Sequence, residues 1–149
     1  MLIHKMNACS TARKTNKINL FIHSEGGDLM AGLSCMDHIS NSAIPITTIV
    51  DGYAASAGAV MVLGGAVRKM MPHSFMLIHQ LSTGFWGKYE DLKDEVKNCE
   101  LFMQDALKIY KKKTSIPEKK LKTFMKRDVY LNFEDCMKYN IVDEVFSGH

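Results

Sequence analysis

Short apolar runs that alternate with helix-type segments most strongly constrain the fold of this chain. The runs span residues 18–23, 46–50 and 75–79, and the second is rich in β-branched side chains, which favour strands. A glycine pair follows the first run, and apolar residues then recur at helical spacing. Gly52 ends the second run, and Ala54–Leu63 has the composition of a helix. Because strands that alternate with helices form parallel sheets with helical crossovers, the pattern predicts an α/β fold.

One long helix is predicted in the second half of the chain. The segment from Tyr89 to Lys112 contains no glycine or proline. A helix of this length measures roughly 35 Å at about 1.5 Å per residue, which is long for so small a domain. We therefore expect it to project and to pack against another subunit, the alternative being a helix that lies on its own sheet. Its apolar residues recur at alternating steps of four and three: Leu92, Val96, Cys99, Met103, Ala106 and Tyr110.

The C-terminal part predicts two shorter helices and a strand. Ser115 is the expected N-cap of a helix, with Glu118 as its capping-box acid. Asn132 is the expected N-cap of a last short helix, and Asn140 suits the left-handed residue at its end. Residues 141–146 then predict a final edge strand.

The composition indicates one compact domain. The chain has 149 residues, of which 46% are hydrophobic and 23% charged. Its longest weakly polar run, 54–67, is shorter than the roughly 18 residues that span a bilayer, and its first residues lack the apolar stretch of a secretory signal. The cysteines form no CxxC pair, which indicates free thiols and predicts a cytoplasmic protein; they lie at positions 9, 35, 99 and 136.

Charge and metal-ligand spacing each raise an alternative function. Between Lys108 and Arg127 there are nine basic residues and one acid, whereas the rest of the chain has ten basic and fifteen acidic residues. Such a segment can attract nucleic acid, but its lysines alternate with apolar residues as on a solvated amphipathic helix, so we expect no nucleic-acid binding. Cys35 and His38 are three residues apart, but without two further ligands we expect no metal.

Ser56 is the most interesting serine. It follows a strand and precedes a helix of small residues, within Gly52-Tyr-Ala-Ala-Ser-Ala-Gly-Ala59. Small neighbours let a carbonyl group approach the hydroxyl, and the first turn of a helix offers N–H groups to a developing oxyanion. The pattern is not Gly-x-Ser-x-Gly, because Ala54 stands two residues before the serine. The alternative interpretation is a serine that only caps a tightly packed helix.

Other residues can complete a catalytic site or serve structure alone. Gly26-Gly27 permits close backbone approach or provides a simple turn, and no Lys-Ser/Thr follows it, which argues against a phosphate loop. His79 ends a strand and is a candidate base for Ser56 if an acid orients it. Asp128 and Asp143 are the candidate acids, and the apolar Val129-Tyr-Leu131 is expected to shield the first of them.

Five blocks, in this order, resemble the proteolytic subunits of Clp proteases (ClpP), a family of self-compartmentalised serine peptidases. The resemblance extends from Ile18 to Val145, and the five blocks together are specific although each alone is weak. The blocks are Phe21-Ile-His-Ser-Glu-Gly-Gly27, Asp51-Gly-Tyr-Ala-Ala-Ser-Ala-Gly58, Met76-Leu-Ile-His-Gln80, Lys126-Arg-Asp128 and Tyr139-Asn-Ile-Val-Asp143.

The resemblance implies a fold, a site and an assembly. The fold is ClpP/crotonase-like, one domain over 1–149, with 1–17 as the remnant of an N-terminal helix and 84–113 as a projecting handle region. Unfolded proteins or peptides would be cleaved to short peptides inside two stacked seven-membered rings. The reaction itself needs no cofactor or metal, and ATP would be used only by a separate AAA+ unfoldase. The implied nucleophile, base and orienting acid are Ser56, His79 and Asp128, with Gly27 and Ala57 supplying the oxyanion N–H groups.

The chain departs from the family pattern at three places. Glu25 stands in Ser24-Glu25-Gly26-Gly27 where the family has proline, and Leu81–Gly87 replaces a proline and a glycine-rich turn. We expect the bulky Phe85 and Trp86 to reshape the substrate groove or the ring contact. Seventeen residues precede Ile18 where the family has several tens, which predicts a shortened or divergent member.

Three alternatives to an active Clp-type endopeptidase stay open. One is a non-catalytic ring subunit of a ClpP-type assembly. Another is a signal-peptide peptidase, which uses a lysine base, so that His79-Gln80 argues against it. The third is an acyl-CoA enzyme of the crotonase type, which lacks a nucleophilic serine and does not need His79.

Overall fold

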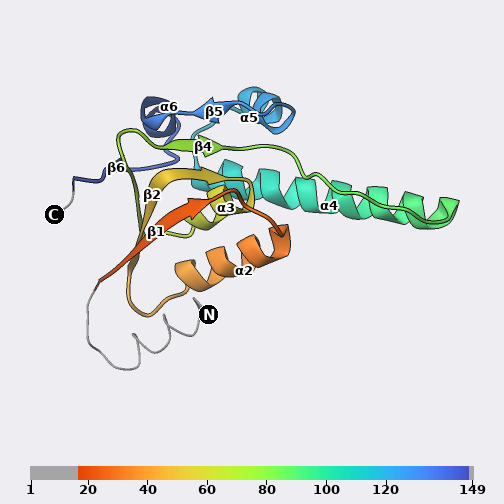
Figure 1. The fold of residues 1–149 in the computed structure, drawn as a ribbon, viewed down its shortest axis with the longest axis horizontal. Coiled ribbons are helices and arrows are strands. Elements are labelled where there is room, and N and C mark those ends of the chain that lie inside the picture. The colour runs from red at the N-terminus through yellow and green to blue at the C-terminus, as the bar shows by residue number, and fades with distance from the viewer. Residues whose placement is uncertain (1–16, 148–149) are drawn as a thin grey trace.

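A largely parallel six-stranded sheet forms the centre of the molecule, with helices packed around it (Figure 1). The computed structural model describes residues 17–147. The elements in chain order are β1 (Ile18–Ser24), α2 (Leu29–Ser40), β2 (Ile46–Ala55), α3 (Ala57–Val62), β3 (Val67–Met70), β4 (Phe75–Leu77), α4 (Tyr89–Lys113), α5 (Glu118–Met125), β5 (Tyr130–Leu131), α6 (Phe133–Lys138) and β6 (Glu144–Val145). The α/β class expected from the sequence is confirmed.

Strand β2 organises the sheet because it pairs with three other strands. Its first half pairs in parallel with β1 and with β3, and its last three residues pair in parallel with β4. Gly52, with φ of 81°, lies between the two halves. Since β1 also pairs with Ala54, β3 and β4 share the opposite edge of β2 and follow one another along it. This arrangement brings the ends of β1, β2 and β4 together.

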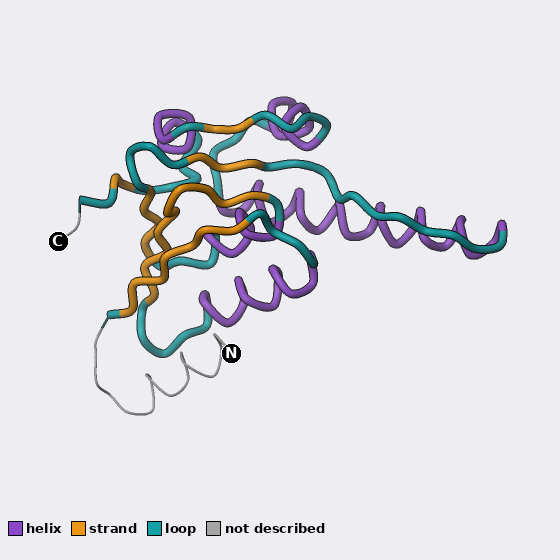
Figure 2. The backbone as a smooth tube through the Cα atoms, viewed as in Figure 1, coloured by secondary structure: helices purple, strands orange, loops and turns teal. Residues whose placement is uncertain are grey.

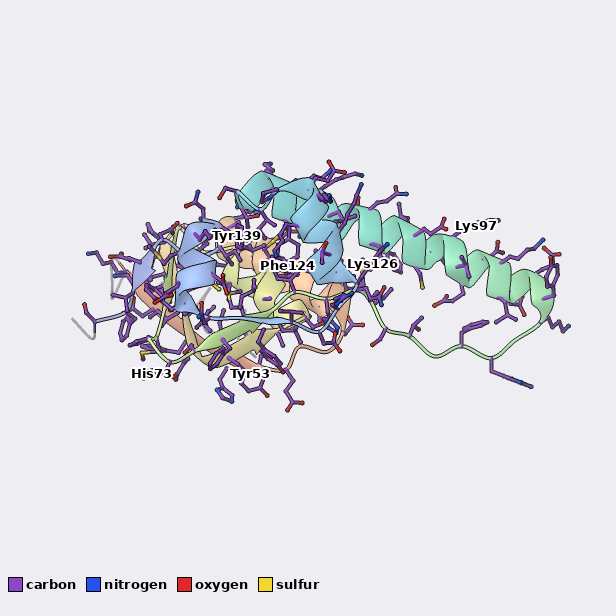
Figure 3. All side chains as sticks on the ribbon, turned by 90° about the horizontal axis from the view of Figure 1, so that it is seen from above. Tyr53, His73, Lys97, Phe124, Lys126 and Tyr139 are labelled. Carbon is purple, nitrogen blue, oxygen red and sulfur yellow. The ribbon has the colours of Figure 1, made fainter. Side chains whose placement is uncertain are left out.

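The core lies between the sheet and the helices. It includes fully buried residues of β2, β3 and β4 such as Val50, Met70 and Met76. Helices α2 and α3 lie together on one side of the sheet, and α5 and α6 lie on another part of the body (Figure 1). Phe124 of α5 and Tyr139, next to α6, contact each other edge to face with ring centroids 5.9 Å apart (Figure 3).

Helix α4 is part of the core at one end and leaves the body at the other. Ala106 and Tyr110 are buried, whereas Leu92 and Val96 are 41% and 59% exposed. Figures 2 and 3 show the first turns of α4, with Lys97 on them, extending away from the sheet beside the loop 78–88. The expected projection is therefore correct for the first half, and the alternative, a helix packed on its own domain, describes the last turns.

Several local expectations need correction. Residues Ala54 and Ala55 continue β2 by pairing with β4, so the helix predicted over 54–63 begins only at Ala57. Ser115 does not cap α5, because the helix begins at Glu118 with Pro117 at the N-cap position. The strand predicted over 141–146 is limited to the two residues of β6 at the sheet edge.

Other local expectations are confirmed, and one concerns residues outside the described part of the chain. The side chain of Asn132 accepts a hydrogen bond from the Asp135 N–H at 2.9 Å, and Asn140 has φ of 51°. The sequence did not predict β3 or β5. The expected remnant of an N-terminal helix lies, apart from Lys17, outside the described residues.

Candidate active site

Ser56 lies on a strained turn between β2 and α3. Its φ of 55° and ψ of −124° fall where residues other than glycine are rarely found, a conformation that costs about 1–3 kcal/mol. The residue occupies the N-cap position of α3, but its side chain makes no cap hydrogen bond. The Ser56 side chain therefore does not cap the start of α3, which argues against a serine that serves only as a helix cap. Such a turn is typical of nucleophile elbows, even though the Gly-x-Ser-x-Gly pattern is absent.

The glycine loop after β1 packs directly against this turn. A Cβ atom on Gly26 would lie 2.7 Å from both the Ala55 carbonyl oxygen and the Ser56 Cβ, and φ at Gly26 is 99°. Gly27, with φ of 130°, has open space where its Cβ would be. The Ala59 N–H donates to the Ser56 carbonyl oxygen at 3.0 Å, and the two N–H groups before it, of Ala57 and Gly58, have no acceptor in the first turn of α3.

The register of the sheet brings His79 to Ser56. Ala55 pairs with Leu77 in the parallel ladder of β2 and β4, and the Ser56 N–H donates to the Leu77 carbonyl oxygen at 2.9 Å. His79 follows β4 by two residues, so it leaves the sheet beside the residue that ends β2. Its side chain is 22% exposed.

The register of a second pair of strands brings Asp128 to His79. In the antiparallel ladder of β4 and β5, Met76 pairs with Leu131 and Leu77 with Tyr130. Continuing the same register places Asp128 opposite His79. The Asp128 Oδ1 and His79 Nδ1 atoms are indeed 3.4 Å apart.

Asp128 is not shielded by the residues that follow it. Its side chain is 76% exposed, and Val129 and Tyr130 are themselves 44% and 55% exposed. The expectation that these apolar residues cover the carboxylate is wrong, because β5 pairs with β4 at the margin of the sheet and not within the core.

The predicted site residues, apart from Asp128, line one small cavity of about 60 Å³. Gly27, Ser56, Ala57 and His79 all contribute to its wall. The far wall comes from α4 and α5, through residues that include Met103, Tyr110 and Met125. The buried end of α4 thus closes the space in front of Ser56, which makes this helix part of the site as well as a projection.

Asp143, the other candidate acid, is engaged elsewhere. It forms two side-chain hydrogen bonds with Arg68, the shorter 2.9 Å long, and accepts a third from the Arg68 N–H. Partial burial would raise the pKa of Asp143, but the hydrogen bonds and charge of Arg68 outweigh burial and hold the pKa below its ordinary value. Arg68 also donates to the Lys113 carbonyl oxygen at 2.7 Å. This pair joins β3, β6 and the end of α4 and has no contact with His79.

A second, larger groove next to His79 was not predicted from the sequence. It has a volume of about 720 Å³, and aromatic residues form much of its wall. A hydrogen bond to Glu25 raises the pKa of Tyr53 at its rim above the ordinary value for tyrosine. The only sequence signal was the unusual Glu25 before the glycine pair. The groove-lining residues are Glu25, Gly52, Tyr53, Ala55, Phe75, Leu77, His79 and Tyr130.

The loop before α4 borders another groove. Leu81 donates its N–H to the Met103 sulfur at 3.1 Å, and Phe85 lines the groove together with Leu92 and Val96 of the helix. Trp86 is not part of its lining and is 96% exposed. The bulky residues of this loop therefore lie along the projecting helix, on the side of the molecule where we expected a contact between rings.

Residues 17–147 contain neither a metal-binding cluster nor a membrane-spanning helix. That part of the chain has no group of three or more His, Cys, Asp and Glu side chains arranged to hold a metal ion, and Cys35 and His38 both lie on α2. No helix described there is long and apolar enough to cross a bilayer.

Comparison with known proteins identifies the family. The family model described as Clp protease matches residues 1–149. The chain is also 35% identical over 131 residues to the ATP-dependent Clp protease proteolytic subunit of Deinococcus radiodurans. That match covers 87% of this chain and 64% of the relative, so the chain spans less than two thirds of the relative's length. The elbow at Ser56, the neighbouring His79 and the fold around them thus belong to a member of the Clp protease family.

Proposed function

We propose that this chain is a serine endopeptidase that cleaves unfolded polypeptides to short peptides through an acyl-enzyme. The observation that carries the proposal is the convergence of Ser56, His79, Gly27 and Ala57 on one cavity, with Asp128 at His79. Family membership supports it further.

In the first half of the reaction, Ser56 attacks the substrate carbonyl carbon. His79 takes the Oγ proton on Nε2, because Nδ1 faces the Asp128 carboxylate. The N–H groups of Gly27 and Ala57 bind the oxyanion of the tetrahedral intermediate, where pre-positioned donors stabilise the developing charge. When the intermediate collapses, the C–N bond breaks and His79 gives its proton to the leaving amine.

In the second half, water takes the place of the amine. His79 removes a proton from the water as it attacks the ester carbonyl, and the second tetrahedral intermediate uses the same two N–H groups. Collapse breaks the ester bond, returns the proton to Ser56 Oγ and releases the new carboxylic acid. No metal or organic cofactor takes part in this scheme.

The proposal includes an assembly in the cytoplasm. The exposed apolar residues on the projecting half of α4 support ring stacking, and we propose two stacked seven-membered rings. Because Asp128 is largely exposed in the single chain, a neighbouring subunit that covers it would strengthen its pairing with His79 by excluding water. A separate AAA+ unfoldase would use ATP and deliver substrates.

A fluorophosphonate probe tests the proposed nucleophile directly. We expect the probe to label Ser56 in the wild type and in the control Ser34→Ala, whose serine is exposed on α2. The Ser56→Ala variant should lose labelling and lower the rate of cleavage of a fluorogenic peptide by several orders of magnitude. Mass spectrometry of the labelled peptide identifies the residue.

Two results would contradict the proposal. One is labelling that survives in Ser56→Ala, and the other is wild-type protein that is neither labelled nor active in any assembled state. The second result would favour a non-catalytic ring subunit, which sedimentation with and without an active relative would then identify.

A further inference from the structure

The groove on the far side of His79 has the features of a binding site. Aromatic rings form much of its wall, and those of Phe75 and Tyr130 are 45% and 55% exposed. Its volume of about 720 Å³ lies within the range of sites that hold organic ligands. Figure 3 shows Tyr53, which lines the groove, on the side of the body away from α4 and α5.

The groove and the cavity at Ser56 are adjacent, because His79 lies between them. The same side chain lines both spaces, and Ala55, next to Ser56 in sequence, lines the groove. In the proposed reaction the scissile nitrogen must lie at His79 to receive its proton, whereas the acyl group stays at Ser56. A substrate that extends past His79 on its amine side therefore enters the groove.

The charge of the groove favours a cation. Of the described residues that line it, Glu25 is the one carboxylate, and none is lysine or arginine. Aromatic faces also attract cations, and long basic side chains lay their apolar stems along such surfaces. Because His79 gains a proton during the reaction, a substrate cation is disfavoured at that end and favoured near Glu25 and Tyr53.

We propose that this groove binds the substrate on the amine side of the cleaved bond and selects a lysine or arginine there through Glu25 and the aromatic wall. The inference rests on the proposed peptidase function for the direction of the substrate. It goes beyond that function because it assigns a specificity-determining role to Glu25.

Matched peptides test the selection. The peptides are identical except for the first residue after the cleaved bond, which is arginine, citrulline or glutamate; citrulline keeps the shape of arginine without its charge. We expect kcat/KM about three- to tenfold higher for arginine than for citrulline, from one exposed cation–π contact and one exposed ion pair. Glu25→Gln should lower this ratio about two- to threefold, because the ion pair is lost and only the attraction to the aromatic rings remains. Asp37→Asn, which removes an equal charge on α2 outside the groove, should keep it.

A binding assay separates this inference from the function on which it rests. Fluorescence anisotropy with the full-length Ser56→Ala variant measures the Kd of the same labelled peptides without turnover, and the arginine peptide should bind more tightly by a similar factor. If the probe does not label Ser56 in the wild-type protein, the peptidase function alone is refuted, and the ratio of the Kd values from anisotropy still tests whether the groove selects a cation.

Three results would overturn the inference. One is equal affinity and equal kcat/KM for the arginine and citrulline peptides, and another is an arginine-to-citrulline ratio that is unchanged in Glu25→Gln. The third is a change in sedimentation on Tyr130→Ala, which would assign the groove to a second copy of the chain. Circular dichroism and cleavage of the citrulline peptide show whether Glu25→Gln is folded.

Discussion

Replacing Gly26 with alanine tests how tightly the glycine loop fits against the candidate nucleophile. A Cβ at this position would lie 2.7 Å from the Ala55 carbonyl oxygen and from the Ser56 Cβ, both of which are held by the sheet. Gly27 provides a matched comparison, because its φ is also positive but its Cβ would meet no atom within 4 Å.

The two variants share one energetic term and differ in another. Alanine at either position adopts an unfavourable positive φ, at about 1–3 kcal/mol. Gly26→Ala must also displace backbone or the Ser56 side chain, which adds about 1–3 kcal/mol by analogy with overpacked cores. We therefore expect Gly26→Ala to be less stable than Gly27→Ala by about 2 kcal/mol. Displacement of Ser56 should also slow its reaction, since small errors in position lower rates strongly.

Urea unfolding followed by far-ultraviolet circular dichroism measures the difference in stability. Tryptophan fluorescence is unsuitable, because Trp86 is 96% exposed in the folded chain. With a urea m-value of about 2 kcal/mol/M, the midpoint of Gly26→Ala should lie about 1 M below that of Gly27→Ala. Both variants are compared at one chain concentration, because assembly shifts apparent stability. The rate of labelling by a fluorophosphonate probe reports on Ser56.

Two results would refute this reasoning. Equal midpoints for the two variants would show that the loop has room to move away from Ser56. A normal labelling rate in Gly26→Ala would show that the contact does not position the nucleophile, even if it stabilises the fold.

Two further variants address the ion pair and the projecting helix. Arg68→Met should lower the free energy of unfolding by about 2 kcal/mol at pH 7, a moderate value because Asp143 is 41% exposed. Arg68 holds the pKa of Asp143 below its ordinary value near 4, so the stabilisation is present above pH 4 and is lost as the pH falls further. Urea unfolding at pH 3 should therefore show a smaller difference in stability between the wild type and Arg68→Met. Val96→Asp, on the exposed part of α4, should reduce the sedimentation coefficient without changing the thermal midpoint of a single chain. The control Lys97→Ala, on the same helix, should leave the sedimentation coefficient unchanged. An unchanged assembly in Val96→Asp would contradict the proposed ring contact.

Sequence reasoning succeeded where a local pattern determines local structure. The long helix and the segment 29–40 show their apolar periodicity directly, and the Asn132 cap depends on one hydrogen bond to a residue three positions away. Sequence reasoning failed where pairing with a neighbouring strand determines the secondary structure. Ala54 and Ala55 have helical composition, yet pairing with β4 keeps them in a strand. The two residues of β5 are too few to show any periodicity, although they bring Asp128 to His79.

The candidate site was predictable in its residues but not in its geometry. The small residues around Ser56 made it a candidate nucleophile in the sequence. Its strained φ of 55°, in contrast, depends on contacts with the glycine loop and with Leu77, which are distant from Ser56 in sequence. Likewise, the residues alone left Asp128 and Asp143 as candidate acids for His79, and the resemblance to the Clp protease family favoured Asp128. The structural distinction comes from the register of β4 and β5 and from the engagement of Asp143 by Arg68.

The packing around Ser56 is tight, whereas the side chains of the neighbouring groove at Glu25 are loosely packed. A Cβ would lie 3.0 Å or less from an atom of another residue at three glycines, Gly26, Gly32 and Gly58. The close approach of the glycine loop, α2 and α3 therefore requires glycine at these positions. These contacts fix the backbone around Ser56. The side chains of Glu25 and Phe75, in contrast, are exposed, and no packing around them selects their chemistry. A change there alters what the groove binds and leaves the elbow in place, so specificity and catalysis should respond to different substitutions.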